Sequence, residues 1–258
     1  MLALVFLVGL LVTASPLAAQ SAADHVAMGV AAIETQDLHT GLAHFEAALA
    51  LDSTHYEANW RAAFAVLDQG EQIADSLADA ERDSLFARAG VLARRAVAAD
   101  SLGPEGHFAV AATVGRASLG MGKKERIRRA KIIRDEALRT LALDPSHDGA
   151  YHVLGRWNAE IMRLSGLSRF VAKSFLGAGI FKQASWEDAI AHLQKAVELD
   201  PGRIYHRLEL ARIYADRKRY QEALDQLGRI SSLPDRELLD PLYRERAAGL
   251  ARRIGEKT

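Results

Sequence analysis

The sequence has 258 residues, and its 33 basic and 33 acidic side chains give a formal net charge of zero. A dedicated nucleic-acid binder usually carries a basic surplus, so we expect no nucleic-acid partner. The complete absence of cysteine excludes disulfides, thiolate metal sites and cysteine nucleophiles. Only six prolines and 7% aromatic residues, together with abundant alanine and leucine, favour helices over strands.

The N-terminus carries an apolar run from Leu2 to Val12, which Thr13 and Pro16 interrupt. The run is about half of the roughly 20 residues that span a bilayer, and the small residues before Gln20 suit a signal peptidase. We therefore expect residues 1–19 to be a signal peptide and the mature chain to be periplasmic or secreted. No Lys or Arg precedes the run, so an uncleaved membrane anchor is the alternative.

A helix followed by the same stop signal recurs along the chain. In the clearest copy, from Ser185 to Pro201, apolar residues recur at three- and four-residue steps and line one helix face. Ser185 can cap the helix, and Pro201 ends it because proline lacks the N–H that the helix needs. Similar endings occur at Asp52, Asp100 and Asp144. Such repetition is typical of repeat proteins.

Taken in order, the chain contains five predicted helix pairs. They cover residues 23–53, 56–100, 104–145, 149–201 and 208–227, and a last amphipathic stretch covers 241–254. Insertions occur within the middle pairs: an acidic stretch at 71–84, a basic one at 123–134 and an apolar one at 163–184. The pattern predicts an all-α fold: an α-solenoid of about five tetratricopeptide-like helix pairs with inter-helix insertions and a C-terminal capping helix. Residues 20–258 are expected to form a single domain.

The fourth pair carries more specific motifs. They are Tyr151-His-Val-Leu-Gly-Arg-Trp157, Ala172-Lys-Ser-Phe-Leu-Gly177, Ser185-Trp-Glu-Asp-Ala-Ile190 and Lys195-Ala-Val-Glu-Leu-Asp-Pro201. In order and spacing they resemble the regulator of microtubule dynamics family, over roughly residues 56 to 232. The resemblance implies the tetratricopeptide architecture and a tendency to bind peptides or lipids. A role in microtubule dynamics is not carried over, because this chain looks exported.

The sequence contains no pattern typical of a catalytic, metal or cofactor site. Nine histidines form no His-Glu-x-x-His motif, and His147 and His152 are not four residues apart. The glycines at 115, 120 and 122 lack the Lys-Ser or Lys-Thr of a phosphate loop, and no Gly-x-Ser-x-Gly elbow occurs. We therefore expect no enzymatic activity, no metal and no cofactor.

In such arrays the first helix of each pair normally lines the concave surface. Aromatic and arginine side chains there would suit peptides with acidic groups or a free carboxylate, through cation–π contacts and paired hydrogen bonds. The sequence thus predicts an interaction scaffold that binds a peptide or protein in a concave groove. The candidate groove residues are Trp60, Phe64, Phe108, Arg116, His152, Arg156 and Arg212.

Two insertions leave alternatives open. The apolar insertion at 163–184 either folds across the groove as a core element or exposes a patch for a lipid or a partner helix. Its lid or lipid-binding candidates are Phe170, Phe175 and Phe181. Binding of a lipid or hydrophobic ligand through this insertion is the alternative function. The basic run from Lys123 to Arg134 is either a solvated helix face or a surface for an anionic membrane or an acidic partner.

Overall fold

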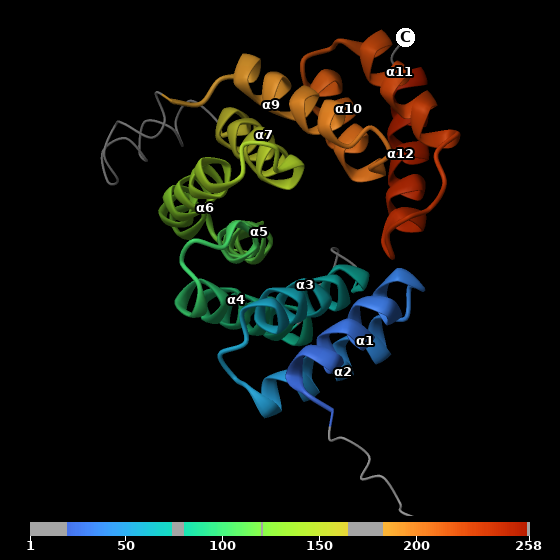
Figure 1. The fold of residues 1–258 in the computed structure, drawn as a ribbon. Coiled ribbons are helices and arrows are strands. Elements are labelled where there is room, and N and C mark those ends of the chain that lie inside the picture. The colour runs from blue at the N-terminus through green and yellow to red at the C-terminus, as the bar shows by residue number, and fades with distance from the viewer. Residues whose placement is uncertain (1–19, 74–79, 120, 165–182, 257–258) are drawn as a thin grey trace, which may run out of the picture.

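The structure is a computed structural model that describes residues 20–73, 80–119, 121–164 and 183–256. These residues form helices and contain no strand, which confirms the predicted all-α class (Figure 1). The helices are α1 (Ala22–Glu34), α2 (Leu38–Leu51), α3 (Tyr56–Gln72), α4 (Ala80–Ala99), α5 (Pro104–Leu119), α6 (Lys123–Leu143), α7 (Asp148–Arg163), α9 (Trp186–Leu199), α10 (Ile204–Asp216), α11 (Tyr220–Ser231) and α12 (Asp240–Gly255). They make five antiparallel pairs followed by a terminal helix, as predicted.

The recurring aspartate of the sequence ends the second helix of a pair by one repeated turn. The side chains of Asp52, Asp100, Asp144 and Asp200 each accept a hydrogen bond from the backbone N–H two residues later, at 2.9, 2.9, 2.9 and 3.1 Å. This local bond competes with continuation of the helix and turns the chain toward the next pair. The repeated stop signal is therefore a repeated turn.

Within the pairs, small residues let the two helices approach closely. A Cβ atom at Gly29 of α1 would lie 2.4 Å from the ring of Phe45 on α2, and one at Gly70 of α3 would lie 2.4 Å from the ring of Phe86 on α4. Each ring occupies the space that a side chain at the glycine would need. In each of the first two pairs, therefore, a glycine of the first helix packs against a phenylalanine ring of the second, as expected of a repeat.

The array curves until its C-terminal end faces its N-terminal end across a central space (Figure 1). Helix α12 covers the last pair with Tyr243, Ala247, Leu250 and Ile254, which confirms the predicted capping helix. The segment before it, residues 232–239, is called the closing segment below. Its Leu238 packs against the apolar core of the first helix pairs. This contact joins the two ends of the array, and it was not predicted from the sequence.

Two of the insertions lie partly or wholly within described helices. Both ends of the acidic stretch at 71–84 are helical, because α3 continues to Gln72 and α4 begins at Ala80. The basic run begins helix α6, where Glu125 pairs with Arg128 and Arg129 at 2.8 Å each.

Several expectations fall on residues outside the described ranges. They are the signal peptide at 1–19 and most of the apolar insertion, with Phe170, Phe175 and Phe181. Among the helices that the structure describes, none combines the length and the apolar character that crossing a membrane requires.

Candidate functional site

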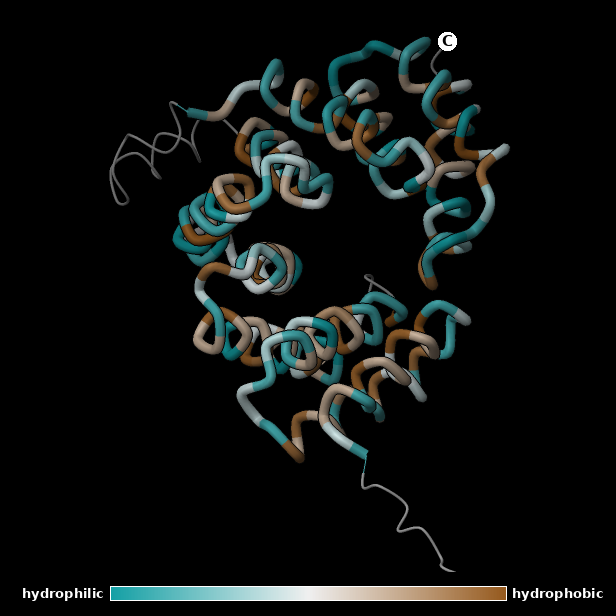
Figure 2. Tube along the Cα trace, in the orientation of Figure 1, coloured by the Kyte–Doolittle hydropathy of each residue, from teal (hydrophilic) through white to brown (hydrophobic). Residues whose placement is uncertain are grey.

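The central space contains a cavity of about 380 Å³. Most of its wall comes from α3, α5, α7 and the start of α10, each the first helix of a pair. The N-terminal half of α6, the α1–α2 turn, the closing segment and Tyr243 of α12 complete it. The helices around the central space carry both hydrophobic and hydrophilic residues (Figure 2). The cavity therefore offers apolar contact together with charged groups, which is the usual composition of a ligand site.

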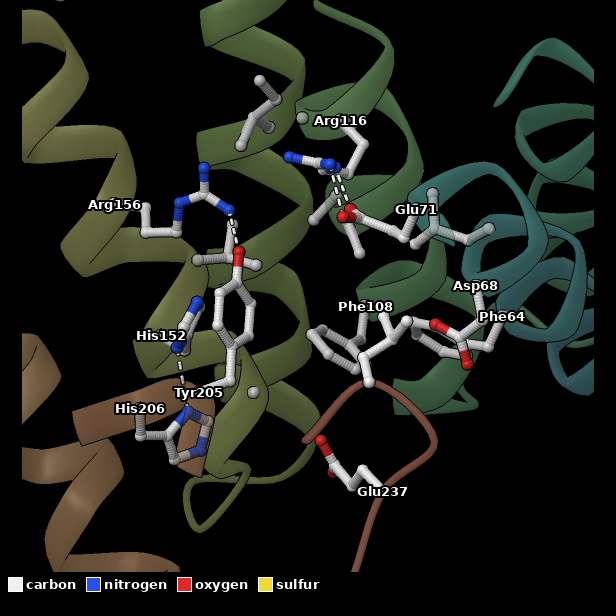
Figure 3. Close-up of a pocket in the computed structure, with 18 of the residues that line it drawn as sticks. Phe64, Asp68, Glu71, Phe108, Arg116, His152, Arg156, Tyr205, His206 and Glu237 are labelled. Atoms are coloured by element: carbon white, nitrogen blue, oxygen red, sulfur yellow. Dashed lines mark hydrogen bonds and ion pairs between the residues drawn. The ribbon is translucent and has the colours of Figure 1, made fainter. Parts of the chain in front are cut away.

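Helices α3 and α5 direct one face each into the cavity. Phe64, Asp68 and Glu71 lie four and three residues apart on α3, so they project from the same side of the helix. Phe108 and Arg116 lie eight residues apart on α5 and are likewise on one face. The rings of Phe64 and Phe108 are 5.1 Å apart between centroids and form an aromatic patch on this wall (Figure 3).

Glu71 and Arg116 form a buried ion pair across these two helices (Figure 3). Their side chains are only 6% and 11% exposed. Burial lowers the pKa of Arg116 to about 10, so the guanidinium is still charged at neutral pH. The pair therefore ties α3 to α5 and neutralises this part of the wall.

A chain of hydrogen bonds crosses the wall between α7 and α10. Nδ1 of His152 lies 2.8 Å from Nδ1 of His206, and Nε2 of His206 lies 2.7 Å from the carboxylate of Asp148. Burial lowers the pKa of both histidines, so both are neutral at physiological pH. Because His206 donates to Asp148 through Nε2, its Nδ1 accepts from His152. This arrangement holds His152 in one orientation in the wall.

Arg156 is the cavity arginine with the weakest opposing charge. It donates to the hydroxyl of Tyr205, a neutral group, and its nearest carboxylate is Glu209 at 3.6 Å (Figure 3). Glu209 is 2% exposed and also pairs with Arg212. Arg156 thus lies at the wall without a hydrogen-bonded carboxylate, although Tyr205, Glu209 and Glu160 together raise its pKa against the effect of burial.

The remaining cavity arginines are held by closer carboxylates. Arg126 pairs with Glu160 at 2.6 Å, and Arg236 pairs with Asp200 at 2.9 Å. Arg203 contacts two carboxylates, Asp148 at 2.9 Å and Glu237 at 2.7 Å. At Arg156, in contrast, an acidic ligand group would meet a guanidinium to which no carboxylate of the wall is hydrogen-bonded.

Five of the predicted groove residues line the cavity: Phe64, Phe108, Arg116, His152 and Arg156. Trp60 and Arg212 do not. Trp60 lies one turn nearer the start of α3, where it packs against the N-terminal core and Arg61 lies over its ring at 4.3 Å. Arg212 lies two turns beyond Tyr205 on α10 and pairs with Glu209. A binding role for all seven residues stays a prediction.

Sequence reasoning missed most of the polar wall residues, and Asp68, Tyr205 and Glu237 show why. Asp68 could have been found by stepping four residues along α3 from Phe64, because that step stays on one helix face. Tyr205 could have been found in the same way from Arg212, seven residues away. Glu237 carries no such signal, since it lies on the closing segment. Among the described residues, no group of histidines and carboxylates could hold a metal ion.

Helix pairs repeated around a concave cavity define the class as a tetratricopeptide repeat protein. The model of the family described as regulator of microtubule dynamics protein 1-3 matches residues 26–255, and the chain belongs to this family. The match confirms the resemblance drawn from the sequence. It also extends beyond the expected range of roughly residues 56 to 232 at both ends.

Comparison with solved structures gives the fold alone. The thermophilic tetratricopeptide protein TTC0263 of Thermus thermophilus is 17% identical with a TM-score of 0.61, over 89% of this chain and 98% of that chain. An IFIT1 monomeric mutant with Gppp-AAAA is 14% identical with a TM-score of 0.51, over 92% of this chain and 54% of that one. No curated protein sequence matches the chain.

Proposed function

We propose that this protein is a non-enzymatic scaffold that binds a short peptide segment of a partner in its central cavity. The observation that carries the proposal is the wall itself, in which the first helices of four successive pairs contribute to one cavity. A volume of about 380 Å³ lies at the lower end of the range for ligand pockets. It suits a few side chains of an extended segment rather than a folded partner.

Arg156 would bind an acidic group of that segment. Its guanidinium already donates to Tyr205, and its nearest carboxylate, Glu209, lies 3.6 Å away without a hydrogen bond to it. A ligand carboxylate would supply the close, hydrogen-bonded counter-charge that the wall lacks.

The test is a screen of an immobilised library of 12-residue peptides with the purified chain. We expect a set of acidic peptides to be retained, and we expect the substitution Arg156→Met to weaken their binding by about tenfold or more, because hydrogen bonds to charged groups contribute about 1.5–3 kcal/mol. Methionine keeps the apolar stem and removes the charge. The control is Arg88→Met, since Arg88 is an exposed residue of α4 that pairs with Glu46. Retention of no peptide, or equal binding by the Arg156→Met variant, would contradict the proposal.

A second candidate function is binding of a lipid or another hydrophobic ligand. Leu164, a described residue at the start of the apolar insertion, lines the cavity beside Trp157 and Ile161. The insertion therefore begins at an apolar part of the cavity wall. Native mass spectrometry of the purified chain distinguishes the candidates, because a bound lipid adds a discrete mass and a peptide scaffold purified alone does not.

We also propose that the chain is exported, on the strength of the apolar run from Leu2 to Val12. The first residue of protein purified from the cell envelope tests this. Cleavage after Ala19 gives Gln20 as the first residue, whereas an uncleaved anchor retains Met1.

A further inference from the structure

The carboxylates of the cavity wall are not equivalent. Four acidic residues line the cavity: Asp68, Glu71, Glu160 and Glu237. Glu71 pairs with Arg116, Glu160 with Arg126 and Glu237 with Arg203. Within the described part of the chain, the carboxylate of Asp68 has no hydrogen bond and no ion pair.

Asp68 also lies where an unpaired negative charge is costly. Burial, and to a smaller extent the nearby charge of Glu237, raise the pKa of Asp68 to about 7 against the opposing effect of Arg203. Arg203 is held by Asp148 and Glu237, so it is not released to pair with Asp68. Tyr243 of α12 is the other titratable group that interacts with Asp68. Among the described residues, therefore, no cation forms an ion pair with this carboxylate, although the charge of Arg203 acts on it from a distance.

The neighbours of Asp68 are aromatic. Phe64 precedes it by one turn of α3, and the ring of Phe108 lies 5.1 Å from that of Phe64 (Figure 3). The faces of aromatic rings attract cations, and most strongly where water is excluded. An unpaired carboxylate beside two aromatic rings is the combination that binds an ammonium or guanidinium group.

We propose that Asp68, Phe64 and Phe108 form a subsite for a basic group of the ligand, the ammonium of a lysine or the guanidinium of an arginine. Where that group belongs to a peptide, this inference rests on the proposed function. Arg156 lies on the opposite wall of the cavity from Asp68 (Figure 3). The preferred segment therefore carries both an acidic and a basic side chain.

Binding at this subsite is coupled to a proton. With a pKa of about 7, Asp68 is mostly protonated at pH 5 and mostly ionised at pH 8. A cation binds the ionised form, so its affinity rises with pH across this range and each binding event releases part of a proton. The aspartate of the unfolded chain is ionised at both values.

The subsite can be tested without a peptide. We would titrate the isotope-labelled chain with n-butylammonium, n-butylguanidinium and n-butanol, and follow the amide resonances of α3 and the closing segment by NMR. We expect saturable binding of the two cations at pH 8, at least about tenfold weaker binding at pH 5, and no saturable binding of butanol. Asp68→Asn should abolish cation binding, and Asp225→Asn, at an exposed residue of α11, should not.

A stability measurement separates a binding role from a structural one. Because the folded-state pKa of Asp68 is raised above its ordinary value, ionisation destabilises the folded chain as the pH rises from about 4 to above 7. Asp68→Asn should therefore raise Tm at pH 8 by about 3 °C or more and leave it nearly unchanged at pH 4. A lower Tm at pH 8 would show that Asp68 is structural and would overturn the subsite. So would cation binding that survives Asp68→Asn, or butanol that binds as tightly as butylammonium.

The two proposals fail separately. If peptides are retained but butylammonium does not bind, the cation subsite is wrong and the scaffold stands. If butylammonium binds through Asp68 and no peptide is retained, the subsite stands and peptide binding is wrong.

Discussion

Replacing Glu71 by alanine is expected to destabilise the protein by about 3 kcal/mol or more. The substitution removes the buried carboxylate that pairs with the guanidinium of Arg116, and removing one member of a buried ion pair is strongly unfavourable. Because the pair connects α3 to α5, the loss also separates two walls of the cavity. Chemical denaturation of the variant and the unmodified chain measures the effect.

Two further variants make this expectation specific. Glu46→Ala removes one partner of an exposed pair, whose side chains are 44% and 47% exposed, and should cost less than about 1 kcal/mol. The double substitution Glu71→Leu and Arg116→Met replaces both charges by apolar groups and should recover most of the lost stability. A loss at Glu71 no larger than that at Glu46 would contradict the buried pair.

Replacing Gly115 by leucine should have opposite effects on stability and on binding. A Cβ atom at Gly115 meets no atom within 4 Å, and this residue of α5 lines the cavity. Leucine would therefore project into open space without a clash. Its higher helix propensity should stabilise the chain by about 0.8 kcal/mol, while its side chain fills part of the space that the ligand needs. We expect peptide affinity to fall by about tenfold or more, a loss of about 1.4 kcal/mol.

The matched control is Gly228→Leu. A Cβ atom at Gly228 also meets nothing within 4 Å, but this glycine is exposed on α11 and does not line the cavity. It should bring a comparable gain in stability and leave binding unchanged. Thermal unfolding and fluorescence anisotropy with a peptide from the library measure the two effects. Equal affinities of the two glycine variants would place the ligand outside the cavity.

Local patterns along the chain were sufficient to predict the helix pairs. The aspartate turns, the apolar periodicity and the small residues at Gly29 and Gly41 each act over a few residues or between adjacent helices. The confirmed architecture follows from these short-range effects, because successive pairs repeat similar turns and similar helix packing. The capping helix was predictable for a related reason, since Tyr243 and Leu250 leave an apolar face that the last pair covers.

The closure of the array could not be predicted in this way. Leu238 reaches the N-terminal core only because the curvature accumulated over five pairs returns the chain to its start. The residues next to Leu238 in the sequence contain no pattern that would predict its contact with the N-terminal core. Glu237 comes near Asp68 through the same closure, so local sequence offered no reason to expect a raised pKa at Asp68.

Side-chain partners explain the other differences within the site. Arg116 was predicted as a groove residue and lines the cavity, but Glu71, which had been placed in an acidic insertion, is buried beside it and pairs with it. Arg212 was predicted to face the groove and instead pairs with Glu209, a residue that is 2% exposed. In both cases a carboxylate on another turn or helix decides what the arginine can bind.

Hydrogen–deuterium exchange with and without a retained peptide tests the central claim that the ligand lies in the cavity of the closed array. Protection on binding should occur in α3, α5, α7, the N-terminal half of α6, the start of α10 and the closing segment, which contribute to the wall. The outer helices α4, α9 and α11 contribute no residue to the wall and should exchange at unchanged rates. Protection confined to those outer helices, with no change in α3 or α5, would contradict the account.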